Sequence, residues 1–260
     1  MSVLLPRRRP MKGNTCATIR KWAMIFLAAG VIGRCIIQNV LLSVGTITSD
    51  QLFEAMNADT TVMILATVAL ICEALETCAA PLFAFLLVEG FQRTSSFEKY
   101  LIRIGGMALL CEIPYNMAYS RSLLDLGSRN PMIGMLICLV MLYFFTRFGD
   151  KGIRNTVIKA GIAVAAFLWC TMLNVDSGEC LVILVGVLWL VREKDNMRAL
   201  YGFCAGMACS MFNMYYIASC LSFIFLHRYE GEQGEENKRL NYAFYPVLLL
   251  IVGTAAILLG

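Results

Sequence analysis

The sequence predicts an all-α protein, a polytopic bundle of about nine transmembrane helices, and three observations predict it. Hydrophobic residues make up 59% of the 260 residues and charged residues only 15%. The mean hydropathy is +0.69. Apolar runs recur from Trp22 to Leu259 with only short polar connections between them. Soluble globular domains carry about 25% charged residues, so the composition excludes that class.

Each apolar segment was compared with the roughly 20 residues that an α-helix needs to cross a bilayer. The connection 46–59 is expected to be a loop. Three late segments are short, so tilted helices or half-helices are expected there, and the count ranges from eight to ten. The expected spans are 22–45, 60–91, 100–118, 131–147, 155–173, 179–191, 199–213, 214–227 and 241–259.

Basic residues predict the orientation, because Lys and Arg are enriched in cytoplasmic loops. The connection 46–59 has neither residue, whereas 92–99 and 148–154 carry both. We therefore expect residues 1–21 to form a basic cytoplasmic tail and residues 22–260 to form one transmembrane domain, with the N-terminus in the cytoplasm. The tail contains Arg7, Arg8, Arg9, Lys12, Arg20 and Lys21.

Cysteine and histidine usage argues against a metal site. Most of the 11 Cys residues lie inside apolar runs, none forms a C-x-x-C pair, and the single histidine is His227. Buried cysteines of this kind pack as small apolar residues. The basic residues are scattered at helix ends, whereas a nucleic-acid partner requires a basic face, so no such partner is expected.

Charged residues inside the apolar segments are the most informative feature. Arg34 lies in the middle of the first segment, and Glu73 and Glu76 lie in the middle of the second. A charge at this depth costs several kcal/mol unless it is paired or hydrated. Residues three apart share one helical face, so we expect Arg34 to form a buried ion pair with these acids. The pair either clasps two helices together or lines a hydrated substrate cavity. Pro81, in the same segment, predicts a kink.

Two further sets of residues lie at the predicted helix ends. Arg93, Lys99 and Arg103 lie at the cytoplasmic ends of the second and third segments, where they either bind an anionic cofactor or anchor the helices at the interface. Glu112 and Asp176 lie at the outer level. These two are candidates for acid–base chemistry, and the alternative is that they mark ordinary helix ends, with Asp176 in a turn or at an N-cap.

Several motifs resemble the signature of the TraX family, bacterial membrane proteins whose namesake acetylates the N-terminus of conjugative pilin. They are APLFAFLLVEGF at 80–91, KYLIRIGGMALLCEIPYN at 99–116, VDSG around Asp176, YEGEQG at 229–234 and NYAFYP at 241–246. The resemblance implies a multi-pass acetyltransferase of the bacterial inner membrane.

The resemblance also implies a chemistry. An acyltransferase of this kind would move acetyl from acetyl-CoA, without a metal, to an amine or hydroxyl of a peptide or small-molecule acceptor. Arg93, Lys99 and Arg103 would then bind the CoA phosphates, and Glu112 and Asp176 would act as the base or as an orienting acid.

The departures from the family pattern leave other functions open. Members of the family that this chain resembles typically carry Asp-His, Gly-Arg and Pro-x-His at three places. At those places this chain has Gly33–Arg34, Glu76–Thr77 and residues 246–248. Both family histidines are therefore absent, and Arg34 with Glu76 resembles a charge swap that preserves an ion pair. The alternatives are a non-catalytic member that acts as a membrane scaffold or partner, and a small transporter.

Overall fold

The computed structural model describes residues 13–44, 47–125, 127–149, 152–229, 231–235 and 237–259. Within these ranges all regular secondary structure is helical, which confirms the predicted all-α class. The predicted tail residues Arg7, Arg8, Arg9 and Lys12 lie outside the described residues, as does Lys151.

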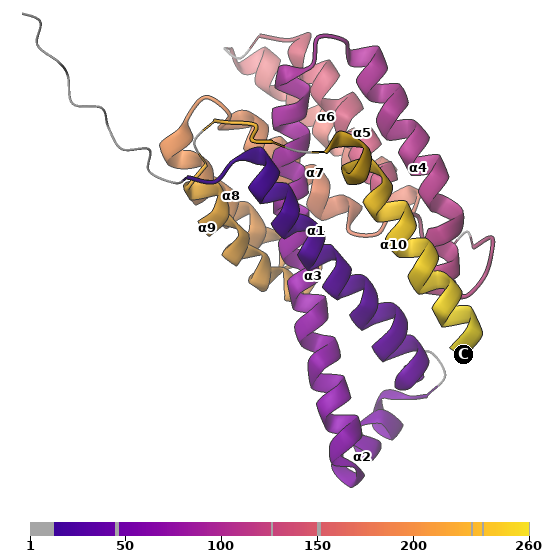
Figure 1. The fold of residues 1–260 in the computed structure, drawn as a ribbon. Coiled ribbons are helices and arrows are strands. Elements are labelled where there is room, and N and C mark those ends of the chain that lie inside the picture. The colour runs from indigo at the N-terminus through magenta and orange to yellow at the C-terminus, as the bar shows by residue number, and fades with distance from the viewer. Residues whose placement is uncertain are drawn as a thin grey trace, which may run out of the picture.

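The helices follow the order of the predicted segments (Figure 1). The first is extended by the π-helical η1, and a 3-10 helix, η2, precedes α9. The bounds are α1 Cys16–Ile32, η1 Gly33–Leu41, α2 Ser49–Ala58, α3 Thr60–Arg93, α4 Phe97–Ser120, α5 Pro131–Thr146, α6 Ile153–Met172, α7 Gly178–Leu190, α8 Asp195–Cys209, η2 Met214–Leu221, α9 Ser222–His227 and α10 Lys238–Leu259.

Among the described residues, four helical stretches are long and apolar enough to cross a membrane. They are Cys16–Leu41, Thr60–Arg93, Ile153–Met172 and Leu240–Leu259. Three shorter apolar helices, at Pro131–Thr146, Gly178–Leu190 and Met214–His227, fall short of a full crossing. Short helices were expected for the last two of these segments, whereas a fuller span was expected at 131–147.

Three of the differences between the structure and the sequence prediction concern where helices begin or divide. Helix α1 begins at Cys16, because the Thr15 side chain caps it by accepting a hydrogen bond from the Thr18 amide, so Arg20 and Lys21 are helical. The predicted loop 46–59 contains α2, whose start is fixed by a reciprocal capping box between Thr48 and Gln51. The predicted single helix at 214–227 is divided between η2 and α9.

Segments from distant parts of the chain meet at two levels of the molecule. At the end where α1 begins, the amides of Asn14 and Cys16 donate to the carbonyls of Arg228 (2.7 Å) and Glu232 (3.0 Å). At the level of Arg34, part-way along the first helix, residue 129 pairs with the turn before α7 through Arg129 N to Asn174 O and Asp176 N to Arg129 O, each 2.9 Å. The segments predicted to share a membrane face thus lie together. That the first end faces the cytoplasm stays a prediction.

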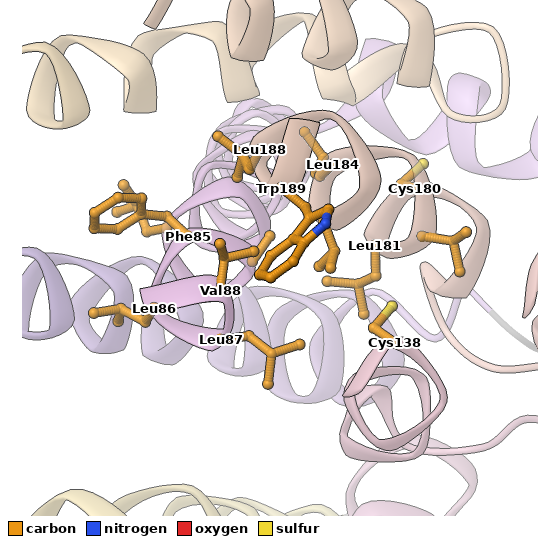
Figure 2. Packing of buried hydrophobic residues seen from close by; sticks show 14 of the residues in the cluster. Phe85, Leu86, Leu87, Val88, Cys138, Cys180, Leu181, Leu184, Leu188 and Trp189 are labelled. Atoms are coloured by element: carbon orange, nitrogen blue, oxygen red, sulfur yellow. The ribbon is translucent and has the colours of Figure 1, made fainter. Parts of the chain in front are cut away.

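The main hydrophobic core lies where α3, α5 and α7 meet (Figure 2). Phe85 on α3 is buried between neighbouring helices, and Trp189 on α7 reaches toward α3. Cys138 of α5 is fully packed, as expected for a cysteine in an apolar run, and Cys180 of α7 is packed as well. This core holds the second half of α3 in a fixed position.

Two glycines let α1 approach α3 very closely. A Cβ atom added to Gly30 would lie 2.2 Å from Cβ of Glu76, and one added to Gly33 would lie 2.3 Å from Cβ of Cys72. Small residues at such a crossing allow two backbones to pack together without a void. Because η1 begins at Gly33, this contact also fixes where Arg34 meets the acids of α3.

Candidate functional site

Arg34 lies at the centre of a polar cluster between the helices. Its Nη1 lies 3.0 Å from Oδ2 of Asp176, and its Nη2 lies 4.0 Å from Oε1 of Glu73. Gln38, one turn further along η1, donates to Oε2 of Glu73 at 3.1 Å. One guanidinium therefore joins the first helix to α3 and to the turn before α7.

Two tyrosines of α4 complete this group, which we call the Arg34 cluster: Arg34, Glu73, Glu76, Asp176, Tyr115 and Tyr119. The Tyr115 hydroxyl donates to Asp176 at 3.3 Å, and the Tyr119 hydroxyl donates to Glu76 at 3.1 Å. The residues are four apart on α4, so their rings stack at 4.4 Å. The Arg34 guanidinium lies over the Tyr119 ring, 5.4 Å from its centroid.

The cluster borders a small cavity. Arg34, Glu73, Glu76 and Asp176 all line it, and its volume is about 70 Å³. The side chains of Arg34 and Asp176 remain 27% and 18% exposed. Polar groups at such a wall can be reached by water or by a small ligand, whereas a sealed ion pair cannot.

A larger cavity of about 260 Å³ adjoins the first. The two cavities share four lining residues: Leu27, Phe83, Pro131 and Met135. The rest of the larger cavity is lined by aliphatic side chains together with polar and aromatic ones, among them Arg20, Tyr100, Arg103 and Tyr242. Arg20 belongs to the second turn of α1, so the larger cavity extends from the Arg34 cluster toward the end where α1 begins.

The predicted buried charges thus lie together, but Asp176, which was not predicted to pair with them, is also a partner. Arg34 was expected to pair with Glu73 or Glu76, and it contacts Glu73 and, more closely, Asp176. Asp176 was expected at the outer level of the molecule. It lies 142 residues from Arg34 along the chain, and no local pattern in the sequence indicates this contact. Tyr115 lies inside the EIPYN motif, which was the only signal for it.

Glu112, the second predicted catalytic residue, holds the start of α5. Its Oε1 lies 2.8 Å from Nη1 of Arg129, and Asn130 also donates to it. Asn130 caps α5 through the Met132 amide (3.0 Å) and donates to the Ala108 carbonyl (3.0 Å). Glu112 is not among the residues that line either cavity.

Arg93 takes part in a second polar group, which we call the Glu89 cluster: Glu89, Arg93, Arg198 and Tyr229. Glu89 lies 3.0 Å from Arg93 Nε and 3.7 Å from Arg198 Nη1, and it accepts from Tyr229 at 3.2 Å. Arg93 also donates to the Tyr229 hydroxyl and to the Gly231 carbonyl, each at 2.8 Å. Burial, with the Cys16 hydrogen bond second, raises the pKa of Tyr229 above its ordinary value.

The three cations predicted to bind one anionic cofactor therefore have different surroundings. Arg93 is engaged in the Glu89 cluster, and Lys99 is exposed on the first turn of α4. Arg103 lines the larger cavity, where it donates to the Tyr242 hydroxyl at 3.1 Å.

A comparison with known protein families identifies a relationship. The TraX protein family model matches residues 53–255, well over half of the chain. The match begins within α2 and includes Glu73, Glu76 and Asp176, whereas Arg34 precedes it. No curated protein and no solved structure matches the chain. The motifs at 80–91 and 99–116 fall inside the matched range, and this chain belongs to the TraX family.

Proposed function

We propose that this chain is a membrane-embedded acyltransferase of the bacterial inner membrane, which moves acetyl from acetyl-CoA to an amine or hydroxyl acceptor. The observation that carries the proposal is the pair of adjoining cavities. One is lined by cations and aromatic residues near the start of α1, and the other by the Arg34 cluster. In the proposed orientation, with the N-terminus in the cytoplasm, the larger cavity receives the cytoplasmic donor.

The larger cavity would hold the acetyl-pantetheine arm of the donor. Its volume of about 260 Å³ is too small for the whole of CoA, so the nucleotide would stay at its mouth. Arg103 lines this cavity, and Lys99 is exposed one turn earlier on α4. Guanidinium and ammonium groups bind phosphate through charge-assisted hydrogen bonds. Arg93 would support this region through the Glu89 cluster rather than contact the cofactor.

The Arg34 cluster would carry out the transfer. The acceptor nitrogen or oxygen attacks the thioester carbonyl, a carbon–nitrogen or carbon–oxygen bond forms and the carbon–sulfur bond breaks. The proton of the acceptor passes to a carboxylate, and the CoA thiolate leaves and takes up a proton. Glu76 would be that base, since it lines the smaller cavity and its carboxylate accepts a hydrogen bond from the Tyr119 hydroxyl. The Arg34 guanidinium would stabilise the oxyanion, positioned by Asp176 and Glu73.

An excess of acids favours an amine acceptor. The Arg34 cluster contains three carboxylates and one guanidinium. Such a site attracts a cationic amine and then accepts its protons, because opposite charges attract strongly where water is scarce. A carboxylate in this place would also explain how transfer can proceed without the family histidines.

Acetyl-CoA binding and transfer by the purified protein test the proposal. Arg103→Gln should weaken CoA binding by about 1 to 3 kcal/mol, the value of one charge-assisted contact. Arg154→Gln, an exposed change on α6, is the matched control. Glu76→Gln should abolish transfer and leave CoA affinity nearly unchanged. Well-folded wild-type protein that binds no CoA would contradict the proposal.

A non-catalytic scaffold is the second candidate. It is favoured by the absence of both family histidines, since the only histidine, His227, ends α9 and lines neither cavity. The same experiment separates the two functions. Wild-type protein that binds CoA without turnover, and whose Glu76→Gln variant behaves identically, would favour the scaffold.

A further inference from the structure

A third hollow lies away from both cavities, on the side of the molecule formed by α5, α6 and α7. It is a groove of about 540 Å³, which we call the α6–α7 groove. Its walls are apolar, with Ala160, Ala163 and Phe167 from α6 opposite Ile183 and Val187 from α7. Its residues play no part in the acyl transfer proposed above.

Charged residues gather at one end of this groove. Lys159 lines it with only 7% of its surface exposed, and Lys194 and Arg192 line it at the end of α7. Arg192 lies 3.3 Å from Glu193, whose side chain is 79% exposed. Among the described residues that line it, the rim therefore carries three basic groups and one acidic group, a net positive charge beside an apolar wall.

The groove has the length of one membrane leaflet. Thr156, near the charged end, and Phe167, at the other end, both line it. These residues are separated by about 16 Å along α6 at 1.5 Å per residue. Half of the hydrocarbon core of a bilayer is about 15 Å thick. An acyl chain that starts at the charged rim would thus be accommodated along the whole groove.

We infer that the α6–α7 groove binds an anionic phospholipid, with its phosphate at Lys159 and Lys194 and an acyl chain along α6. Charge complementarity at the rim selects the head group, and the apolar walls take the chain. A second copy of this protein would need an acidic, apolar helix of its own to fill the groove. The rim's basic residues favour the lipid.

Two glycines provide a matched pair of test variants. A Cβ atom at Gly186, which lines the groove, or at Gly161, which does not, meets nothing within 4 Å. Leucine is a better helix former than glycine, so both Gly186→Leu and Gly161→Leu should fold. Only the first places a side chain inside the groove. Lys194→Gln removes an exposed rim charge, and Arg154→Gln is its control.

The experiment titrates the full-length protein in detergent with phosphatidylglycerol or phosphatidylcholine and counts bound lipid by native mass spectrometry. Wild type should retain one phosphatidylglycerol about tenfold more tightly than phosphatidylcholine, and Gly186→Leu should lose this binding. Lys194→Gln should weaken phosphatidylglycerol about fivefold without affecting phosphatidylcholine. Gly161→Leu and Arg154→Gln should match the wild type.

Three outcomes of this titration would overturn the inference, and displacement of the lipid by inorganic phosphate would be a fourth. The first three are equal retention of the two lipids by the wild type, equal losses in the two leucine variants, and a dimer that only Gly186→Leu dissociates while lipid retention stays unchanged. Inorganic phosphate is the probe for the head group alone. It should fail to displace the lipid at millimolar concentration, and displacement would show that the apolar walls do not contribute.

Discussion

The Glu89 cluster and the Arg34 cluster are both partly buried and charged, yet they are built in opposite ways. Around Glu89, two guanidiniums and a phenol converge on one carboxylate. Around Arg34, one guanidinium contacts two carboxylates, a third accepts a hydrogen bond from the Tyr119 phenol, and all three carboxylates line a cavity. In the Glu89 cluster the donors match the acceptors, and the group ties segments of the chain together. In the Arg34 cluster the carboxylates outnumber the cations beside a cavity, so the group can bind a proton or a cationic substrate.

The largest expected effect on stability comes from the Glu89 cluster. Glu89→Gln should destabilise the protein by about 3 to 5 kcal/mol, because two guanidiniums lose the charge of the buried carboxylate that they share. The Glu89 side chain is only 10% exposed. The control Glu193→Gln removes an acid that is 79% exposed and should cost at most about 1 kcal/mol. Thermal unfolding in detergent measures both, and equal shifts would refute the structural role of Glu89.

Removing Arg34 should cost less stability. Arg34→Ala should destabilise by about 2 kcal/mol, since water from the cavity hydrates the carboxylates that lose their partner. Adding Asp176→Asn should restore about 1 kcal/mol of that loss, because the two side chains lie 3.0 Å apart. Strictly additive losses in this double-mutant cycle would show that the pair does not interact in the membrane.

The Tyr229 hydroxyl offers a second test of the Glu89 cluster. Tyr229→Phe removes a group that contacts Cys16, Arg93 and Glu89 and should cost about 1 to 2 kcal/mol. Because the folded pKa of Tyr229 is raised, its contribution to stability is fully present below about pH 10, the unfolded value, and is lost as pH rises further.

Melting temperatures between pH 8 and pH 11 measure this dependence. The wild type should lose more stability over the range than Tyr229→Phe does, and parallel profiles for the two proteins would contradict the assignment.

The smallest effect is expected from labels placed at the two ends of the molecule. Ser95→Cys and Leu124→Cys are exposed changes near the start and after the end of α4, and neither should alter stability. A membrane-impermeant thiol reagent should reach residue 124 in intact cells and residue 95 only in inverted vesicles. Cys16 is unsuitable for this purpose because it is buried against Tyr229. The reverse labelling pattern would invert the proposed orientation.

The sequence predicted the helices well because a long apolar run has few alternatives to a membrane helix. It missed α2, although the capping residues Thr48 and Gln51 were visible at its start. The close packing of α1 on α3 also had a signal, since Gly30 and Gly33 lie on the first helix near Arg34. These small residues were not read as a helix crossing.

The candidate site was predicted only in part. Arg34, Glu73 and Glu76 stood out because charges are costly within apolar segments. The role of Asp176 could not be predicted, because its position against Arg34 depends on how the turn before α7 packs on residue 129. The same is true of Arg93, whose partners Tyr229 and Gly231 come from much later in the chain. Spacing within one helix cannot indicate such contacts.

The contact between the segment before α1 and α9 determines when the start of the chain can be fixed in place during synthesis. Asn14 donates its side chain to the Phe225 carbonyl, a contact that spans 211 residues. During synthesis the first helix must therefore wait in the bilayer, its leading end unanchored, until nearly the whole chain has emerged. Chains that terminate before residue 225 would therefore lack a contact at their beginning as well as the helices missing from their end.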